Sequence, residues 1–283
     1  MEIAENRVFG LDILRFIAIF MVLLGHSLIL APPAVKKIVN PFLYDGVAIF
    51  FVLSGFLIGG ILLKVLNKST ASWAGLLDFW KRRWMRTLPV YLFVLLYLLI
   101  YTALVLPEKF PSEWYRFFFF IQNIFGHHRP GFFAEAWSLS IEEWFYLSVP
   151  LFIFGALIFF KTSTKTTILT VSLIILGLVT WYRYHLYYKY GFPSHPNPLQ
   201  IKQFQDYLNK DIEYQVIPRL DSIMYGVLAA YIAFYYPKWW SQKWNFVLLL
   251  VGIFLLFYTK FHMGKTYGPF NNIWCPSLKS LGV

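Results

Sequence analysis

The chain has 283 residues, of which 58% are hydrophobic and only 14% are charged, and its mean hydropathy is +0.57. Hydrophobic runs of close to 20 residues recur along it, and an α-helix needs about that length to cross the ~30 Å hydrocarbon core of a bilayer. This composition excludes a soluble enzyme and predicts an all-α, polytopic transmembrane helical bundle. The net charge of +11 comes from basic residues between the spans, where membrane topology and anionic lipid explain it, so nucleic-acid binding is not expected.

Seven hydrophobic segments are long enough to be predicted as full spans. They cover residues 11–31, 46–66, 88–106, 137–160, 166–183, 216–236 and 244–260. A shorter segment, 114–125, would extend only about 18 Å as a helix, which is less than the thickness of the hydrocarbon core. We therefore predict about seven full spans plus one short or re-entrant segment, in a single integral membrane domain over residues 1–283.

The distribution of positive charge predicts the orientation of these spans. The segment 64–87 carries six basic side chains against one acidic side chain, Asp78, and loops of this kind remain cytoplasmic. The amino terminus is then cytoplasmic as well, and the connections 107–136 and 184–215 lie on the outer face. The first span lacks a basic leader and a small-residue cleavage site, so we expect it to be retained rather than removed as a signal peptide.

The cysteine and histidine content argues against a metal centre. The only cysteine is Cys275, which excludes an internal disulfide and every metal site built from several cysteines. The histidines have no metal-ligand spacing on a common helix. We predict no metal site and no tightly bound cofactor.

The first span carries two ionisable side chains on one face. Its sequence, LDILRFIAIFMVLLGH at 11–26, places Arg15 eleven residues before His26. This spacing is three turns plus about 20°, so on a helix both side chains share one face, about 16 Å apart along the axis. Ionisable residues inside a span are candidate functional residues. In the plainer interpretations, Arg15 reaches the interface and pairs with Asp12, and His26 bonds a helix carbonyl at the outer interface.

Three further polar groups stand at the ends of spans. The basic cluster that contains Arg83 and Arg86 is either a lipid-binding, topogenic patch or a site for a ligand with several phosphates. Arg219 and Asp221, at the outer start of a span, either pair with each other or line a binding site. The third group is the segment WSLSIEEWFY, which begins at residue 137.

The polar side chains of WSLSIEEWFY also have a structural interpretation. Acidic residues in the first turns of a helix are favoured by its dipole, and Ser138 can cap the helix. Glu142 and Glu143 are adjacent, so on a helix they point about 100° apart and only one of them faces a shared site. We expect Glu143 to face the lipid headgroups. In another span, Gly55 and Gly59 have the small-xxx-small spacing that lets two helices pack closely.

The motifs taken together resemble the membrane-bound acyltransferase-3 family. They occur in the family's order over roughly residues 10 to 235, and they are LDILR with His26, GVAIFFVLSGFLIGG, FWKRRWMRTLPVY, WSLSIEEWFYLSVP and RLDSIMYG. Members of this family are multi-span inner-membrane proteins. They transfer acetyl or another short acyl group from a cytoplasmic donor, usually acyl-CoA, to an extracytoplasmic glycan or other hydroxyl-bearing acceptor. The resemblance implies an O-acyltransferase in the inner membrane, with acyl-CoA as co-substrate and membrane lipid around it.

The resemblance also implies roles for particular residues. His26 would be the base that removes the hydroxyl proton, or else the nucleophile that carries the acyl group, because a histidine has the required pKa near neutrality. The other implied residues are the catalytic Arg15 and Glu142, the donor-binding Arg83 and Arg86, and the acceptor-side Trp137, Ser138, Arg219 and Asp221. Glu142 would orient His26 or help to accept the proton of the acceptor.

Two observations qualify this interpretation. The membrane domain of the family usually has more spans than this chain offers, so the domain is expected to be short at its carboxyl terminus. A multi-span transporter or permease for a small anionic solute would also place charged residues in spans. A transporter built from two corresponding halves would show an internal repeat, and no such repeat is visible in the sequence.

Overall fold

The computed structural model describes residues 9–124, 132–191, 197–240, 242–261 and 269–283. All regular secondary structure in these ranges is helical, which confirms the predicted all-α class. Six segments are long and apolar enough to cross a membrane. They are built on α1 (Phe9–Ser27), α3 (Gly46–Lys68), α4 (Trp73–Val105), α6 (Ala136–Phe160), α7 (Thr164–Tyr190) and α9 (Leu220–Tyr235).

The remaining helices are shorter. The apolar α10 (Gln242–Phe261) occupies the position of the seventh predicted span, and its apolar part, Asn245–Phe261, is shorter than the other six. The others are α2 (Pro33–Val39), α5 (Tyr115–Phe118), α8 (Pro198–Leu208) and α11 (Pro269–Leu281). The predicted short segment 114–125 forms only the four-residue helix α5 and turns over its described residues. The prediction that this segment does not cross as a full helix is therefore confirmed.

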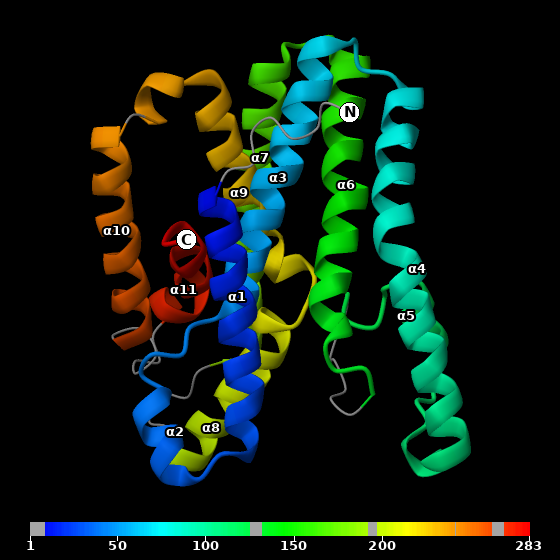
Figure 1. The fold of residues 1–283 in the computed structure, drawn as a ribbon, viewed down its shortest axis with the longest axis vertical. Helices are drawn as coiled ribbons and strands as arrows, with labels where there is room; N and C mark the ends of the chain where they lie inside the picture. Colours follow the sequence, from blue (N-terminus) through cyan, green and yellow to red (C-terminus); the bar gives the residue numbers. More distant parts are fainter. Residues whose placement is uncertain (1–8, 125–131, 192–196, 241, 262–268) are drawn as a thin grey trace.

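The two ends of the bundle differ in their connections (Figure 1). The helices α2 and α8 lie at one end, which we call the α2 end. The turns between α3 and α4 and between α6 and α7 lie at the opposite end, which we call the turn end. The helices α10 and α11 stand beside the bundle, and α11 packs against α7, α9 and α10.

The start of α4 was predicted incorrectly. Residues 64–87 were predicted to form a loop, but α3 continues to Lys68 and α4 begins at Trp73. The Ser72 hydroxyl accepts a hydrogen bond from the Gly75 N–H at 3.2 Å and caps α4. The buried side chains of Leu76 and Phe79 then anchor the first turns of α4 on the core. The basic residues that follow are therefore carried on a packed helix.

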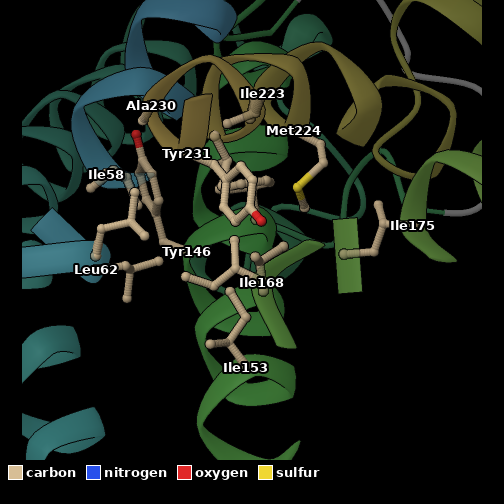
Figure 2. Packing of buried hydrophobic residues seen from close by; sticks show 14 of the residues in the cluster. Ile58, Leu62, Tyr146, Ile153, Ile168, Ile175, Ile223, Met224, Ala230 and Tyr231 are labelled. Carbon is tan, nitrogen blue, oxygen red and sulfur yellow. The ribbon is translucent and has the colours of Figure 1, made fainter. Parts of the chain in front are cut away.

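The core forms where α3, α6, α7 and α9 meet. Figure 2 shows buried side chains from these four helices packed together, among them Ile58, Tyr146, Ile168 and Tyr231. The centre of this region is the close contact between α3 and α9, which have the most extensive packing of any helix pair. A Cβ atom on Gly55 would lie 1.8 Å from the Ile223 carbonyl oxygen, so glycine is required there. The predicted packing role of this small-residue spacing is confirmed.

Candidate active site

Four polar side chains meet inside the bundle, and we call them the polar cluster: Ser54 of α3, Arg83 of α4, and Glu142 and Tyr146 of α6. The Tyr146 hydroxyl donates to Glu142 Oε2 at 2.9 Å and accepts a hydrogen bond from Arg83 Nη2. The Tyr146 hydroxyl has only one proton, and Glu142 accepts it, so in the contact between the two hydroxyls Ser54 is the donor. The guanidinium of Arg83 lies 4.0 Å from the centre of the Tyr146 ring and 3.8 Å from Glu142. The cluster therefore joins three spans around one phenol oxygen.

A proline in α6 fixes the position of Tyr146. Pro150 has no N–H, so the carbonyl of Tyr146, four residues earlier, has no donor within the helix. Trp80 of α4 supplies that donor, with its Nε1 2.9 Å from the Tyr146 carbonyl oxygen. This bond ties α4 to α6 one turn away from Arg83. The pairing of Arg83 with Tyr146 follows from the same helix register.

Glu143 does not face the lipid headgroups, so that prediction was wrong. Its residue exposure is 5%, and its Oε1 accepts a hydrogen bond from the Thr87 hydroxyl at 2.9 Å. The two adjacent carboxylates do diverge around α6, but both directions are covered by neighbouring helices. The reason is that α4 begins early and lies along this face of α6, contrary to the predicted loop.

Arg83 and Arg86 lie in different surroundings. The side chain of Arg83 is 19% exposed and belongs to the polar cluster, whereas Arg86 is exposed. The neighbouring Arg82 pairs with Asp78 on the exposed face, with its Nε 3.0 Å from a carboxylate oxygen. The structure therefore separates the two predicted donor-binding arginines.

Arg15 and His26 lie on the single helix α1, so they share one face as the spacing predicts. His26 is in the last turn, near the α2 end, and its side chain is exposed. Arg15 donates to Asp12 at 3.0 Å, which is the plainer of its two interpretations. Glu142 has Arg83 and Tyr146 as its partners, and no hydrogen bond joins it to His26 within the described residues.

Trp137 and Arg219 both lie beside the Phe51 ring. Arg219 is 1% exposed, and its guanidinium lies 5.6 Å from the centre of the Phe51 ring. The Trp137 ring is nearly perpendicular to the Phe51 and Tyr214 rings, and its centre lies 6.1 Å and 5.0 Å from theirs. These two predicted acceptor-side residues are thus brought into one region of the bundle.

The carboxylate beside Arg219 belongs to Asp45, which sequence analysis did not single out. Asp45 Oδ2 lies 3.4 Å from Arg219 Nη2, and Oδ1 accepts bonds from the N–H groups of Val47 and Ala48, each at 3.1 Å. Burial acts to raise the pKa of Asp45, but Arg219, Lys279 and the two N–H groups outweigh it and hold this pKa below its usual value. An aspartate directly before an apolar helical segment is a typical N-cap, and this sequence signal could have revealed the position.

Asp221 pairs with Arg183, so the alternative in which it pairs with Arg219 was wrong. Arg183 Nη2 lies 2.6 Å from Asp221, and the Ser277 hydroxyl donates to the other carboxylate oxygen at 2.7 Å. Both charged side chains are fully buried and connect α7, α9 and α11. The remaining acceptor-side residue, Ser138, is partly exposed and donates to the Glu135 carbonyl at 3.1 Å rather than capping α6.

Neither Tyr146 nor Ser54 was among the predicted site residues. Tyr146 follows Glu142 by four residues, so it lies on the same face of α6. That spacing was available as a signal. The partnership with Ser54 spans 92 residues of sequence and has no local signal.

The sequence pattern of a known family, described as "Acyltransferase domain", matches residues 8–282. O-acetyltransferase OatA of Staphylococcus aureus (strain NCTC 8325 / PS 47) is 33% identical over 186 residues, which is 60% of this chain and 29% of that protein. Peptidoglycan O-acetyltransferase OatA of Listeria monocytogenes is 33% identical over 150 residues, which is 48% of this chain and 23% of that protein.

A third relative, the putative peptidoglycan O-acetyltransferase YrhL of Bacillus subtilis, is 30% identical over 151 residues, 47% of this chain and 23% of that protein. The matched part of the chain therefore spans less than a third of the length of each of these relatives. No solved structure matches the chain.

Proposed function

Because the chain belongs to the acyltransferase-3 family, as its motifs indicate, we propose that it transfers an acetyl or other short acyl group from cytoplasmic acyl-CoA to a hydroxyl of an extracytoplasmic glycan. Two relatives are named for O-acetylation of peptidoglycan, so a peptidoglycan glycan is the acceptor to test first. The protein is an integral membrane protein by its six apolar helices and its family. We place it in the cell's inner membrane with a cytoplasmic amino terminus.

The charge of the turn end supports this orientation. The connections there, between α6 and α7 and between α9 and α10, and the first turns of the helices that follow them carry basic and no acidic residues: Lys161, Lys165, Lys238 and Lys243. Such connections stay in the cytoplasm. The turn end then faces the donor, and the α2 end, which includes the exposed His26, faces the acceptor.

The observation that carries the proposal is the polar cluster. Ionisable side chains inside a span are costly, and they persist where they bind or move something. Arg83 is positioned by Tyr146 and Glu142, and its guanidinium is suited to bind a phosphate or the carbonyl oxygen of the donor. Its Nε is buried and has no partner among the described residues, so donor capacity remains.

The reaction itself needs one base and one leaving group. The acceptor hydroxyl oxygen attacks the thioester carbonyl, the C–O bond forms, and the C–S bond breaks to release the CoA thiolate. His26 takes the hydroxyl proton in this scheme. In the alternative scheme His26 first accepts the acyl group on a ring nitrogen and then yields it to the hydroxyl.

The test is acyl transfer by purified protein reconstituted in vesicles. Acyl-CoA labelled in the acyl group is supplied on one side and a peptidoglycan glycan on the other. We expect label in ester linkage on the glycan, and we expect His26→Ala to abolish it while the protein still inserts. Label that accumulates inside the vesicles without a new ester would overturn the proposal in favour of transport.

A further inference from the structure

A cavity of about 230 Å³ lies beside the polar cluster, between α4, α6 and the segment that follows α5. Glu143 is the only charged side chain among its lining residues. The others are aromatic or aliphatic: Trp84, Leu88, Phe118, Phe119, Phe120, Trp144 and Leu147. The mechanism proposed above uses none of these residues, so the cavity has no assigned role.

One oxygen of Glu143 lacks a hydrogen-bond donor. Oε1 accepts from Thr87, whereas Oε2 is buried and accepts no hydrogen bond of normal geometry among the residues that the structure describes, and the nearby side chain of Trp84 gives this carboxylate only partial stabilisation. A buried carboxylate oxygen without a donor is unfavourable, because it has lost its water and gained nothing in exchange. A ligand that places a hydrogen-bond donor in the cavity would supply the hydrogen bond that Oε2 lacks.

The part of the cavity wall formed by Phe120 is held by several contacts. Phe120 has a φ of 54°, in the left-handed region that side chains such as phenylalanine rarely adopt. Trp144 Nε1 donates to the Phe120 carbonyl at 2.9 Å, and the Tyr91 ring lies 4.5 Å from the Phe120 ring. Tyr91 in turn donates to the Phe117 carbonyl at 2.7 Å. The strained conformation is therefore stabilised by defined contacts, and the cavity is preformed.

The surroundings favour a neutral hydroxyl donor over a cation. The guanidinium of Arg83 already acts on the Glu143 carboxylate, which leaves little net attraction for a second positive charge. Aromatic faces such as those of Trp84 and Trp144 accept the C–H faces of a sugar ring. The volume is below the roughly 300–1,000 Å³ of sites for drug-sized ligands, so it suits a single ring.

The cavity also lies on the acceptor side of the bundle. Glu143 is seven residues from Ala136, at the α2 end of α6, and 17 residues from Phe160. These separations are about 11 Å and 26 Å along the helix. We propose that the cavity binds one sugar ring of the acceptor glycan, with a ring hydroxyl donating to Glu143 Oε2. This inference rests on the proposed function and names the acceptor subsite.

The test is direct binding of a fluorescently labelled N-acetylglucosamine–N-acetylmuramic acid disaccharide to the detergent-purified protein. Leu147→Trp fills the cavity, and Leu151→Trp, one turn further along α6 at a 36% exposed position, is its matched control. Glu143→Gln keeps the shape of the side chain but removes the charge. We expect the dissociation constant to rise roughly tenfold or more in Leu147→Trp and Glu143→Gln, and to stay within about twofold in Leu151→Trp.

The outcomes separate this inference from the proposed function. Wild-type protein that does not bind the disaccharide, or equal binding in all variants, would overturn the cavity as the acceptor subsite. If Leu147→Trp does not fold, Glu143→Gln decides the result. Label transfer to glycan with unchanged binding in the variants would leave the proposed function standing alone. The expected binding pattern without any transfer would refute the proposed function and retain a sugar-binding cavity.

Discussion

Asp45 stabilises the first turn of α3 and balances the buried Arg219 at the same time. The pKa of this carboxyl is lowered in the folded protein, so its ionised form is the one that the fold favours. The ionised Asp45 therefore stabilises the folded protein fully above the unfolded pKa of about 3.9, and this stabilisation is lost as pH falls through the lower pKa of the folded state.

Asp45→Asn tests this charge without removing the cap, because asparagine also caps helices well. We expect the variant to be less stable than wild type by about 1–3 kcal/mol at pH 5–8, since Arg219 remains buried without its partner. Below about pH 4 the difference should shrink, because Asp45 is protonated first in the unfolded wild type and then, as pH falls through its lower folded pKa, in the folded protein too. Thermal unfolding in detergent across pH measures both effects. A difference that grows in acid would contradict the assignment.

Residue spacing predicts direction around a helix but not what lies in that direction. Glu142 and Glu143 do diverge as expected, yet the covering of Glu143 depends on where α4 begins. The partners Asp45 and Arg219 are 174 residues apart, and no local pattern relates them. The sequence therefore allowed charged residues to be chosen as candidate site residues, but which of them pair with one another could be seen only in the folded structure.

At the scale of elements, the α3–α9 contact depends on the absence of one side chain. A Cβ on Gly55 would lie 1.8 Å from a backbone oxygen of α9, and a rigid backbone has no way to yield locally. Gly60, on the same helix, has nothing within 4 Å of its Cβ position. The small-residue spacing correctly predicted a close helix contact on α3, but it did not predict that α9 would be the partner.

Gly55→Ala and Gly60→Ala therefore form a matched pair. We expect Gly55→Ala to separate α3 from α9 and to cost about 1–3 kcal/mol or more. Gly60→Ala should be neutral or slightly stabilising, since alanine favours helix over glycine by up to about 1 kcal/mol. Melting temperatures and yields of folded protein in detergent give the comparison. Equal effects of the two substitutions would show that the close contact is not required.

The bond between Trp80 and α6 predicts a non-additive pair of substitutions. Trp80→Phe leaves the Tyr146 carbonyl without a donor and should destabilise the protein by about 1–3 kcal/mol. Pro150→Ala introduces an N–H four residues later, which can bond that carbonyl within α6. We expect the double variant to be more stable than Trp80→Phe alone. Strictly additive losses in a double-mutant cycle would contradict this account.

At the scale of the whole molecule, the bilayer explains why so much of the architecture was predictable. Span length is set by the thickness of the hydrocarbon core, so hydropathy located the positions of α1, α3, α6, α7 and α9. Hydropathy fails for the first half of α4, where basic residues are carried on a helix that continues beyond its apolar part. It also says nothing about which helices are neighbours.

The Arg183–Asp221–Ser277 network joins distant parts of the chain, because it fixes α11 to α7 and α9. Breaking a buried ion pair by removing one partner leaves an uncompensated charge, which typically costs 3–5 kcal/mol. We expect this loss for Asp221→Leu and a similar one for Arg183→Met. The double variant should recover a large part of the loss, because no charge is then left buried.

The control for this network is a charge pair of similar chemistry on the surface. Arg82 and Asp78 form an exposed pair on α4, and removing either should change stability far less than removing Arg183 or Asp221. Thermal unfolding of the single and double variants at both sites gives the two coupling energies. A coupling at Arg183 and Asp221 no larger than that at Arg82 and Asp78 would mean that α11 is held by its apolar contacts instead. A larger one would establish that the buried charges determine how α11 sits against the bundle.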